Sequence, residues 1–578
     1  MLHRYWFCAA VVILNSVLMA GCAGHSGAVR SSAQKSNTPP ASTSTSGSVA
    51  DEREEKAAKA HAHYAAGIVH DMNDDTEAAL RDYYAAATAD PGNERLVLEV
   101  SRRFLQNKQP EKAQEILERA ASRPNASGAV MARLGLVYLQ LGKTDQAVHA
   151  SRAAIKRSPE SLAGYQNLFL HYLQSKQTPE ALKILEEAAK QPNADADFLL
   201  GLAELYGSLI AQTPAQKEKL KPEVLAVLSR AGKIDPLNAS QRLRLAEGFN
   251  AFGETDKAAQ IYLDLLKALP DLPLVRERVH ARLAGIFLRE SDHKRAVEQL
   301  EALVRDDPTN PQAYYYLGYL AYNDKNSAQA ADYFSKAILL NPGFEDAYYD
   351  LALAQISLDK PAEALATLEK ARKQFQKNFV MEVYTGLAYS RQKEYREAVK
   401  HYTEAEIIAK ATDPTRLGQE FYFQLGAAYE RIGDFEQSEQ YFEKCLQLKP
   451  DFPEAQNYLG YMWAEHGIKL DKARELIEKA VKAEPKNAAY LDSLGWVLFK
   501  LDKPQEALNY VLKAVALTEE PDATLYEHLG DIYAALSQPE KAREAWTKSL
   551  AVEPNDAVKK KLEVDSHPEE TPKTNDGE

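Results

Sequence analysis

The sequence predicts an all-α protein made of about 14 helical hairpins that follow one another along the chain. Three observations lead to this fold class. A pattern of small and large apolar residues returns about every 34 residues between residues 56 and 554. Within each copy the apolar positions lie three or four residues apart, which is the spacing of one face of a helix. Many copies also have turn-forming residues in the middle and a proline at the end.

The clearest copy contains both helices of one hairpin. Its marked positions are Tyr314, Leu317, Gly318, Ala330, Phe334, Ala337 and Pro342. The first three share one face of a first helix, the next three share one face of a second, and the polar stretch 323–326 between them favours a turn. Pro342 ends the second helix because proline lacks an amide hydrogen and clashes with the preceding turn. We expect Gly318 and Ala330 to face each other where the two helices cross, since small side chains permit a close approach.

Other copies repeat this arrangement of a small residue in each helix. They include Gly135 with Ala147, Gly386 with Ala398, Gly460 with Ala473, Gly495 with Ala507, and Gly530 with Ala542. The pattern resembles the tetratricopeptide repeat. The resemblance covers residues 56–554 and implies a right-handed α-solenoid of about 14 helix-turn-helix repeats. One hairpin cannot bury its apolar face alone, so stability is expected to come from stacking on the neighbours.

Three segments depart from the repeat. Residues 212–222 interrupt one copy, and we expect either a longer loop or an extended helix end there. Residues 555–565 carry spaced apolar residues and are predicted to form a capping helix, which solenoids need at their ends. Residues 566–578 are acidic and contain proline, and we expect them to be a disordered tail.

The first segment, residues 1–21, has the features of an export signal. Arg4 is followed by an uncharged apolar stretch that is too short to span a bilayer comfortably. Small residues precede Cys22, which resembles the cleavage and acylation site of a bacterial lipoprotein. The alternatives are an ordinary signal peptide cut after Ala20 and an uncleaved anchor helix. Residues 22–55 are rich in Ser, Thr and Pro at their start and are expected to be a flexible tether.

Composition and motifs argue against several classes of function. The chain of 578 residues has a net charge of −13, which disfavours binding nucleic acid over a whole face. We find no His-Glu-x-x-His motif, no phosphate-binding Gly-rich loop and no Gly-x-Ser-x-Gly motif. Of the three cysteines, Cys445 occupies a small position of its copy and is interpreted as a buried core thiol. We therefore expect no catalytic site, no cofactor and no metal.

A partner-binding groove is the candidate site. In tetratricopeptide arrays the first helix of each repeat lines the concave face, and several positions there are aromatic although the motif does not require it. The candidate residues are Gln312, Tyr315, Tyr319, Tyr322, Tyr349 and Phe423. Tyrosine offers a large contact area and a hydroxyl at low entropic cost, which suits the capture of a peptide. The alternative is that these side chains pack against the adjacent repeat.

The sequence favours a non-enzymatic adaptor or scaffold that binds protein partners or peptide segments. Because the residue after Cys22 is Ala23 and not Asp, the lipoprotein resemblance implies lipid anchoring at the periplasmic face of the bacterial outer membrane. The second half is similar to bacterial tetratricopeptide lipoproteins, some of which deliver substrates to a carboxyl-terminal processing protease. The alternative is an assembly factor for an outer-membrane or polysaccharide export complex. Homo-oligomerisation remains open, and binding of nucleic acid is not expected.

Overall fold

The computed structural model describes residues 47–269 and 272–566. Regular structure in this part of the chain is helical throughout, with 29 α-helices and two short 3-10 helices. The predicted all-α repeat fold is confirmed. The proposed signal peptide, Cys22 and most of the expected acidic tail lie outside the described residues.

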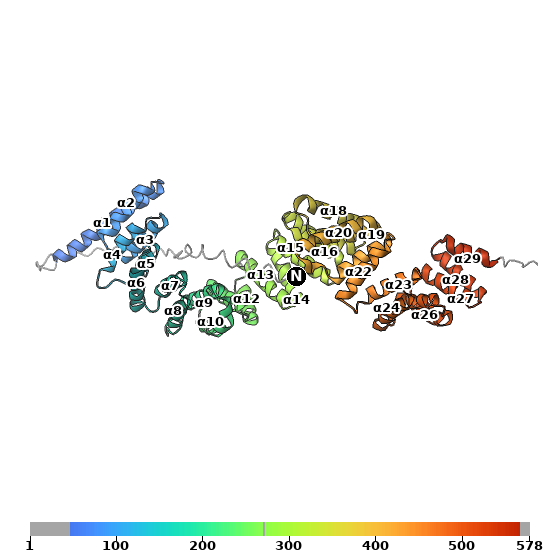
Figure 1. Cartoon of the computed structure of the whole chain (residues 1–578). Coiled ribbons are helices and arrows are strands. Elements are labelled where there is room, and N and C mark those ends of the chain that lie inside the picture. The colour runs from blue at the N-terminus through green and yellow to red at the C-terminus, as the bar shows by residue number, and fades with distance from the viewer. Residues whose placement is uncertain (1–46, 270–271, 567–578) are drawn as a thin grey trace, which may run out of the picture. The chain divides into compact units, whose positions relative to one another are not determined.

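The chain divides into two compact units, residues 1–216 and residues 217–578. The helices of the first unit are α1 (Gly47–Met72), α2 (Thr76–Ala89), α3 (Glu94–Gln106), α4 (Pro110–Ala121), α5 (Gly128–Gln140), α6 (Thr144–Arg157), α7 (Leu162–Gln174), α8 (Thr178–Ala189), α9 (Ala196–Gln212) and η3 (Pro214–Gln216). Helices α1 to α8 pack as four successive hairpins, and α9 follows them (Figure 1).

The second unit holds the remaining helices. They are α10 (Lys217–Ala231), α11 (Ala239–Ala251), α12 (Thr255–Ala268), α13 (Pro273–Arg289), α14 (His293–Asp306), α15 (Pro311–Asn323), α16 (Ser327–Leu340), α17 (Glu345–Ser357), α18 (Pro361–Gln374), α19 (Phe379–Arg391), α20 (Tyr395–Thr412), η4 (Pro414–Arg416), α21 (Gln419–Arg431), α22 (Phe435–Leu448), α23 (Pro453–Glu465), α24 (Leu470–Ala483), α25 (Ala488–Lys500), α26 (Pro504–Leu517), α27 (Ala523–Ala535), α28 (Pro539–Val552) and α29 (Asp556–Ser566). Helices α11 to α28 form nine hairpins, and α29 buries Val558 beside Trp546.

The helical array begins earlier than the sequence suggested. Helix α1 starts at Gly47, so residues 47–55, which we assigned to the tether, are helical. The reason is local: Ala50, Glu52, Arg53, Glu54 and Glu55 are all strong helix formers. Glu52 and Lys56, four residues apart, also form an ion pair of 3.8 Å on the helix surface.

The irregular copy contains lengthened helices, so of the two alternatives the extended helix end is confirmed and the longer loop is not observed. Helix α9 continues to Gln212, η3 follows directly, and α10 begins at Lys217. Pro222 lies inside α10 and does not end it. Pro222 is the sixth residue of α10 and has no amide hydrogen to donate to the carbonyl of Glu218, so the helix continues without that one bond.

Close helix crossing explains the recurring glycines. In some copies the expected approach to the alanine of the second helix is present: a Cβ atom built on Gly460 would lie 2.9 Å from the carbonyl oxygen of Ala473. In the copies with a large aromatic residue the nearest contact is different. A Cβ atom built on Gly318 would lie 2.7 Å from the ring of Phe334, the large residue of the second helix. On Gly386 it would lie 2.8 Å from the ring of Tyr402. The glycine therefore makes room for an aromatic ring, and Ala330 is not its nearest neighbour.

Candidate binding face

The odd-numbered helices of the second unit form a continuous layer. From α15 to α27, each odd-numbered helix contacts the next odd-numbered helix, while contacts between successive even-numbered helices are sparse in this described stretch. The layer with closer packing along a curved stack lies on the inside of the curve. We call the exposed side chains of α15, α17, α19, α21, α23, α25 and α27 the concave face.

Tyr315 on α15 links its repeat to the next one. Its hydroxyl donates a hydrogen bond of 2.8 Å to Oδ2 of Asp350 on α17. Its ring lies 4.6 Å from the ring of Phe344 and 5.7 Å from that of Phe334, measured between centroids. Tyr315 therefore packs between repeats and positions Asp350.

Two other candidate tyrosines also make contacts across repeats. The hydroxyl oxygens of Tyr322 and Ser357 are 3.0 Å apart. Tyr349 is buried, donates a hydrogen bond of 2.6 Å to Glu345 and accepts one of 2.7 Å from Asn378. These contacts fit the packing alternative, and they do not test whether the same side chains also touch a partner.

The remaining candidates differ in exposure. Phe423 packs against Phe442, Phe452 and Tyr458, with ring centroids 5.3–5.8 Å apart. Gln312 is exposed and Tyr319 is half-buried, both on α15. Tyr315, Tyr322 and Phe423 are half-buried as well, so only Tyr349 of the six candidates is buried, and the role of all six in binding stays a prediction.

Two carboxylates on α17 lie among these tyrosines. Burial raises the pKa of Asp350 to about 6, the hydrogen bond from Tyr315 opposes this shift, and the charge of Asp346 adds to it. Burial, followed by the charge of Glu345, also raises the pKa of Asp346. Burial and the charge of Asp350 raise the pKa of Tyr384 on α19 to about 12. The centre of the concave face therefore carries partly desolvated negative charge.

A second group of aromatic and acidic residues lies on α23, α25 and α27. Trp496 stacks on His528 with centroids 3.9 Å apart, and its indole Nε1 donates a hydrogen bond of 2.7 Å to Glu465. His528 Nδ1 lies 2.9 Å from Oδ2 of Asp492. Beside this group, burial raises the pKa of Tyr461, as do the charges of Glu465 and Asp492. The sequence reading missed this group, although Asp492 and His528 occupy the same part of the first helix as Tyr315 and Tyr349 do.

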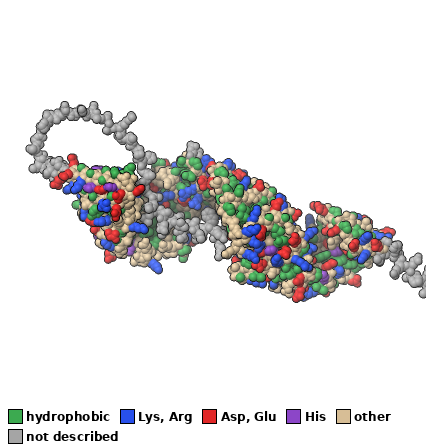
Figure 2. All heavy atoms as spheres, turned by 90° about the horizontal axis from the view of Figure 1, so that it is seen from above, with side chains coloured by type: hydrophobic (Ala, Val, Ile, Leu, Met, Phe, Trp, Pro, Cys, Tyr) green, Lys and Arg blue, Asp and Glu red, His purple; other side chains and the backbone are tan. Residues whose placement is uncertain are grey.

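Elsewhere on the second unit, acidic side chains lie close to basic ones. At α13, Arg278 donates a hydrogen bond of 2.6 Å to Glu247 of α11, and Arg282 lies 3.5 Å from the same carboxylate. On the face drawn in Figure 2, acidic and basic side chains are interspersed. The net charge of −13 is therefore not gathered into one large area of that face.

Cys445 is fully buried in α22, and burial, followed by the charge of Glu420, raises the pKa of its thiol to about 12. A thiol with this pKa is a poor nucleophile near neutral pH. Among the residues that the structure describes, no three His, Cys, Asp or Glu side chains are grouped to hold a metal ion. Within residues 47–269 and 272–566, no helix is both long and apolar enough to cross a membrane.

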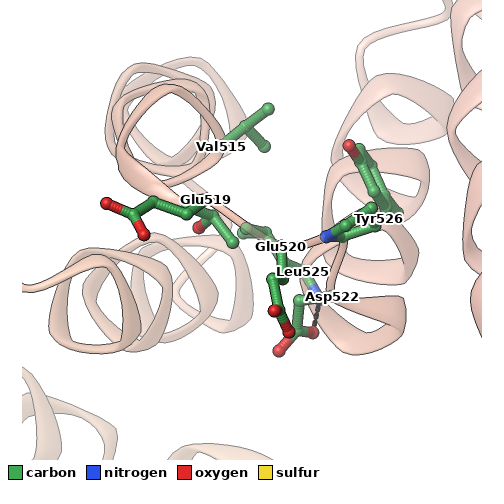
Figure 3. A pocket seen from close by; sticks show the side chains of 8 residues that line it. Val515, Glu519, Glu520, Asp522, Leu525 and Tyr526 are labelled. Atoms are coloured by element: carbon green, nitrogen blue, oxygen red, sulfur yellow. Dashed lines mark hydrogen bonds between the residues drawn. The ribbon is translucent and has the colours of Figure 1, made fainter.

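A small hollow lies at the turn between α26 and α27. It is lined by acidic and apolar side chains that include Glu519, Glu520, Leu525 and Tyr526 (Figure 3). Asp522 in this turn accepts a hydrogen bond of 2.9 Å from the backbone N–H of Leu525 and so caps α27. Asp522 thus serves the helix end, and we do not regard the hollow as the functional site.

Family models described as tetratricopeptide repeat match several stretches of the chain. They cover residues 129–161, 282–344, 321–380, 419–452, 469–523 and 493–557. The chain is a tetratricopeptide repeat protein. Tetratricopeptide repeat proteins typically mediate protein–protein interactions and are generally non-enzymatic.

Two curated relatives are similar to part of this chain. The TPR repeat-containing protein PA4667 of Pseudomonas aeruginosa is 30% identical over 38% of this chain and 36% of its own length. The type IV pilus assembly protein PilF of the same organism is 30% identical over 23% of this chain and 53% of its own length. The chain thus spans between a third and about half of the length of these two relatives.

Solved structures of repeat proteins match this chain with low TM-scores. A tetratricopeptide repeat protein from Parabacteroides merdae superposes with a TM-score of 0.35 at 19% identity, over 44% of this chain and 99% of that chain.

Proposed function

We propose that this tetratricopeptide repeat protein is a non-enzymatic adaptor that holds an extended segment of a partner protein along the concave face of its second unit. The observation that carries the proposal is the unbroken contact of odd-numbered helices from α15 to α27, with aromatic side chains at intervals along them. An extended segment can contact many repeats at once, because each repeat adds one step to the same surface.

Crosslinking in the native envelope tests this proposal. A photo-reactive residue at Tyr319, which is half-buried on α15, is expected to label a second protein. The same residue at Glu443, exposed on the even-numbered helix α22, serves as the control site. Labelling from Tyr319 of only this chain would show self-association in place of partner capture, and equal labelling from both sites would contradict use of the concave face.

We further propose that Cys22 carries the lipid that anchors the adaptor at the periplasmic face of the outer membrane. The support is the run of small residues before Cys22 and the Ala at position 23. Two or more acyl chains give stable anchoring. Replacing Cys22→Ser is expected to release the protein from membranes and to leave its helix content unchanged. Continued sedimentation of the variant with the membrane fraction would contradict the lipid anchor.

One specific version of the adaptor presents substrates to a carboxyl-terminal processing protease. Its support is the similarity of residues 457–461, 492–496 and 527–533 to tetratricopeptide lipoproteins of that kind. Purification of the full chain from detergent-solubilised membranes is expected to bring a protease with it. Recovery of the chain with other partners and no protease would remove this version and leave the adaptor proposal in place.

A second candidate is an assembly factor for an outer-membrane or polysaccharide export complex. It is favoured by the similarity to a protein named for type IV pilus assembly. The two candidates differ in how long the partner stays bound. An assembly factor is expected to remain in a large complex through size-exclusion chromatography, whereas a substrate adaptor is expected to release its partner.

A further inference from the structure

Helix α1, the first helix of the described chain, leaves large apolar side chains exposed. Ile68, Val69 and Met72 have 39%, 55% and 80% of their surface exposed. The opposite side of α1 packs on α2 (Figure 1), where a Cβ atom built on Gly67 would lie 2.6 Å from the ring of Tyr83. The exposed residues therefore do not belong to the face by which α1 completes its own hairpin.

The C-terminal end of the helical array is closed in a different way. Helix α29 buries Val558 beside Trp546. Its Lys561 pairs with Asp531 at 2.7 Å and with Glu527 at 2.8 Å. Solenoids need a polar outer face on their terminal repeats. Helix α1 lacks such a face, so its exposed apolar residues call for a second element that covers them.

The exposed residues of α1 have the spacing of a helix-pairing seam. We call Ala58, Ala62, Ala65, Val69 and Met72 the α1 seam; they follow one another at intervals of four, three, four and three residues, and all five are exposed. Apolar residues at alternating intervals of three and four form the line along which two helices pack side by side. The element that covers the α1 seam is therefore expected to be another helix.

The parts of the chain outside the described residues offer little apolar surface for this purpose. Residues 22–46 contain one large apolar residue, Val29, and residues 567–578 contain none. The apolar stretch of residues 6–20 is removed under the lipid-anchor proposal, and the inference rests on that proposal in this respect. A second copy of the chain, in contrast, carries a helix with the matching spacing.

The side chains of the α1 seam also change in size along the helix. Alanine occupies the first three positions, and Val69 and Met72 occupy the last two. In an antiparallel pair centred on Ala65, Met72 of one copy lies opposite Ala58 of the other. Val69 likewise lies opposite Ala62. Large side chains then face small ones along the contact, which gives even packing. A parallel pair would set large against large and small against small, and would pack unevenly.

We infer that α1 pairs with α1 of a second copy of this chain, as an antiparallel dimer held by the α1 seam. The contact is isologous, so each copy covers the seam of the other and the assembly closes at two chains. A contact along about 22 Å of one helix buries less than the ~1,200–2,000 Å² of a standard interface, so the dimer is weak in dilute solution. Lipid anchoring raises the local concentration of the two copies on one membrane and favours the pair.

Disulfide trapping in membranes that contain the full chain tests the inference. Ala65→Cys places a thiol at the centre of the antiparallel pair, next to the same residue of the second copy, and is expected to give a crosslinked dimer under mild oxidation. Ala58→Cys is the matched control, because its neighbour in the antiparallel pair is Met72 and not a second thiol. The native Cys445 is buried, and the unchanged protein gives the background.

A second pair of variants shows whether the apolar seam holds the dimer. In the Ala65→Cys background, Val69→Glu places two carboxylates in the contact and is expected to lower the crosslinked fraction about tenfold. Leu339→Glu makes the same change on α16, at a residue that is 79% exposed, and is expected to have little effect. Both positions are exposed, so both variants are expected to keep the wild-type helix content, which circular dichroism measures.

Three results would overturn the inference. They are no crosslinked dimer from Ala65→Cys, equal crosslinking from Ala58→Cys, and crosslinking that Val69→Glu leaves unchanged. The proposed function is judged separately, by the release of Cys22→Ser from membranes and by partner capture from Tyr319. A crosslinked dimer together with a Cys22→Ser variant that stays on membranes would keep the dimer and remove the lipid anchor.

Discussion

The hydroxyl of Tyr315 donates a 2.8 Å hydrogen bond to Asp350 of the following repeat, and this pair joins two successive helices of the concave face. Both residues belong to surfaces that a partner would approach. The pair therefore couples the packing of repeats to the charge of the face, because the hydrogen bond holds Asp350 where its carboxylate is partly desolvated.

Removing the hydroxyl should raise the pKa of Asp350 further. The hydrogen bond from Tyr315 is the contribution that lowers this pKa, so Tyr315→Phe is expected to move it above its present value of about 6. The variant should also lose about 1 kcal/mol of unfolding free energy. Tyr316→Phe on the same helix is the control, and a loss as large in the control would contradict a specific role for the bond.

Asp350→Asn is expected to stabilise the folded protein near neutral pH. The pKa of Asp350 is raised from 3.8 to about 6, so at about pH 7 its ionised form costs on the order of 3 kcal/mol, which the amide avoids. Between the unfolded and folded pKa values the folded wild type binds the proton more tightly. The stability contributed by this group therefore rises as the pH falls from about 6 towards 4.

Urea unfolding across this pH range measures the effect. The stability difference between Asp350→Asn and the wild type should be largest above the folded pKa and should vanish below the unfolded one. A constant difference would show that Asp350 is not the titrating group.

A buried ionic cluster in the second unit leads to the opposite prediction for stability: removing its carboxylate should lower the free energy of unfolding. Glu382 on α19 has 1% of its side chain exposed, lies 2.6 Å from Nδ1 of His401 and accepts a 2.5 Å bond from Arg372. Burial alone would raise the pKa of Glu382, but the hydrogen bonds from His401 and Arg372 outweigh it and lower the pKa. Glu382→Gln is expected to cost about 2 kcal/mol near neutral pH, since the half-buried guanidinium of Arg372 loses its carboxylate.

The pH dependence of that cost checks its origin. A lowered carboxyl pKa stabilises the fold above the unfolded pKa of about 4.3, and this stability is lost as the pH falls through the folded pKa. The difference between Glu382→Gln and the wild type should therefore shrink in acid. Glu397→Gln removes a half-buried carboxylate of α20 that pairs with the exposed Lys400, and it should have little effect; an equal effect there would contradict the argument.

The repeat spacing alone was enough to predict the hairpins, because the positions of Leu317, Gly318, Ala330 and Phe334 encode two helical faces. The start of α1 at Gly47 was missed because a Ser- and Thr-rich segment leads into it without a boundary signal. The surroundings of Asp350 depend on three helices that are far apart in sequence. The period of the repeat does not give the distances between these helices, so the raised pKa of Asp350 could not be predicted from the sequence.

Gly318 offers the most direct test of how the hairpins close. A Cβ atom there would meet the ring of Phe334 at 2.7 Å, and both residues are buried. Gly318→Ala is therefore expected to lower the unfolding free energy by about 1–2 kcal/mol, although alanine is the better helix former. Gly207→Ala in α9 is the control: nothing lies within 4 Å of its Cβ position, so it should be neutral or stabilise by up to about 1 kcal/mol.

A double-variant cycle assigns the cost of Gly318→Ala to the ring. Phe334→Leu removes Cε1 and Cζ, two of the three ring atoms that the new methyl group would meet, so it should cost less in the Gly318→Ala background than in the wild type. Chemical denaturation of the four proteins gives the coupling energy. Simple additivity would mean that the strain comes from elsewhere, because a clash confined to these two side chains must disappear when either one is made smaller.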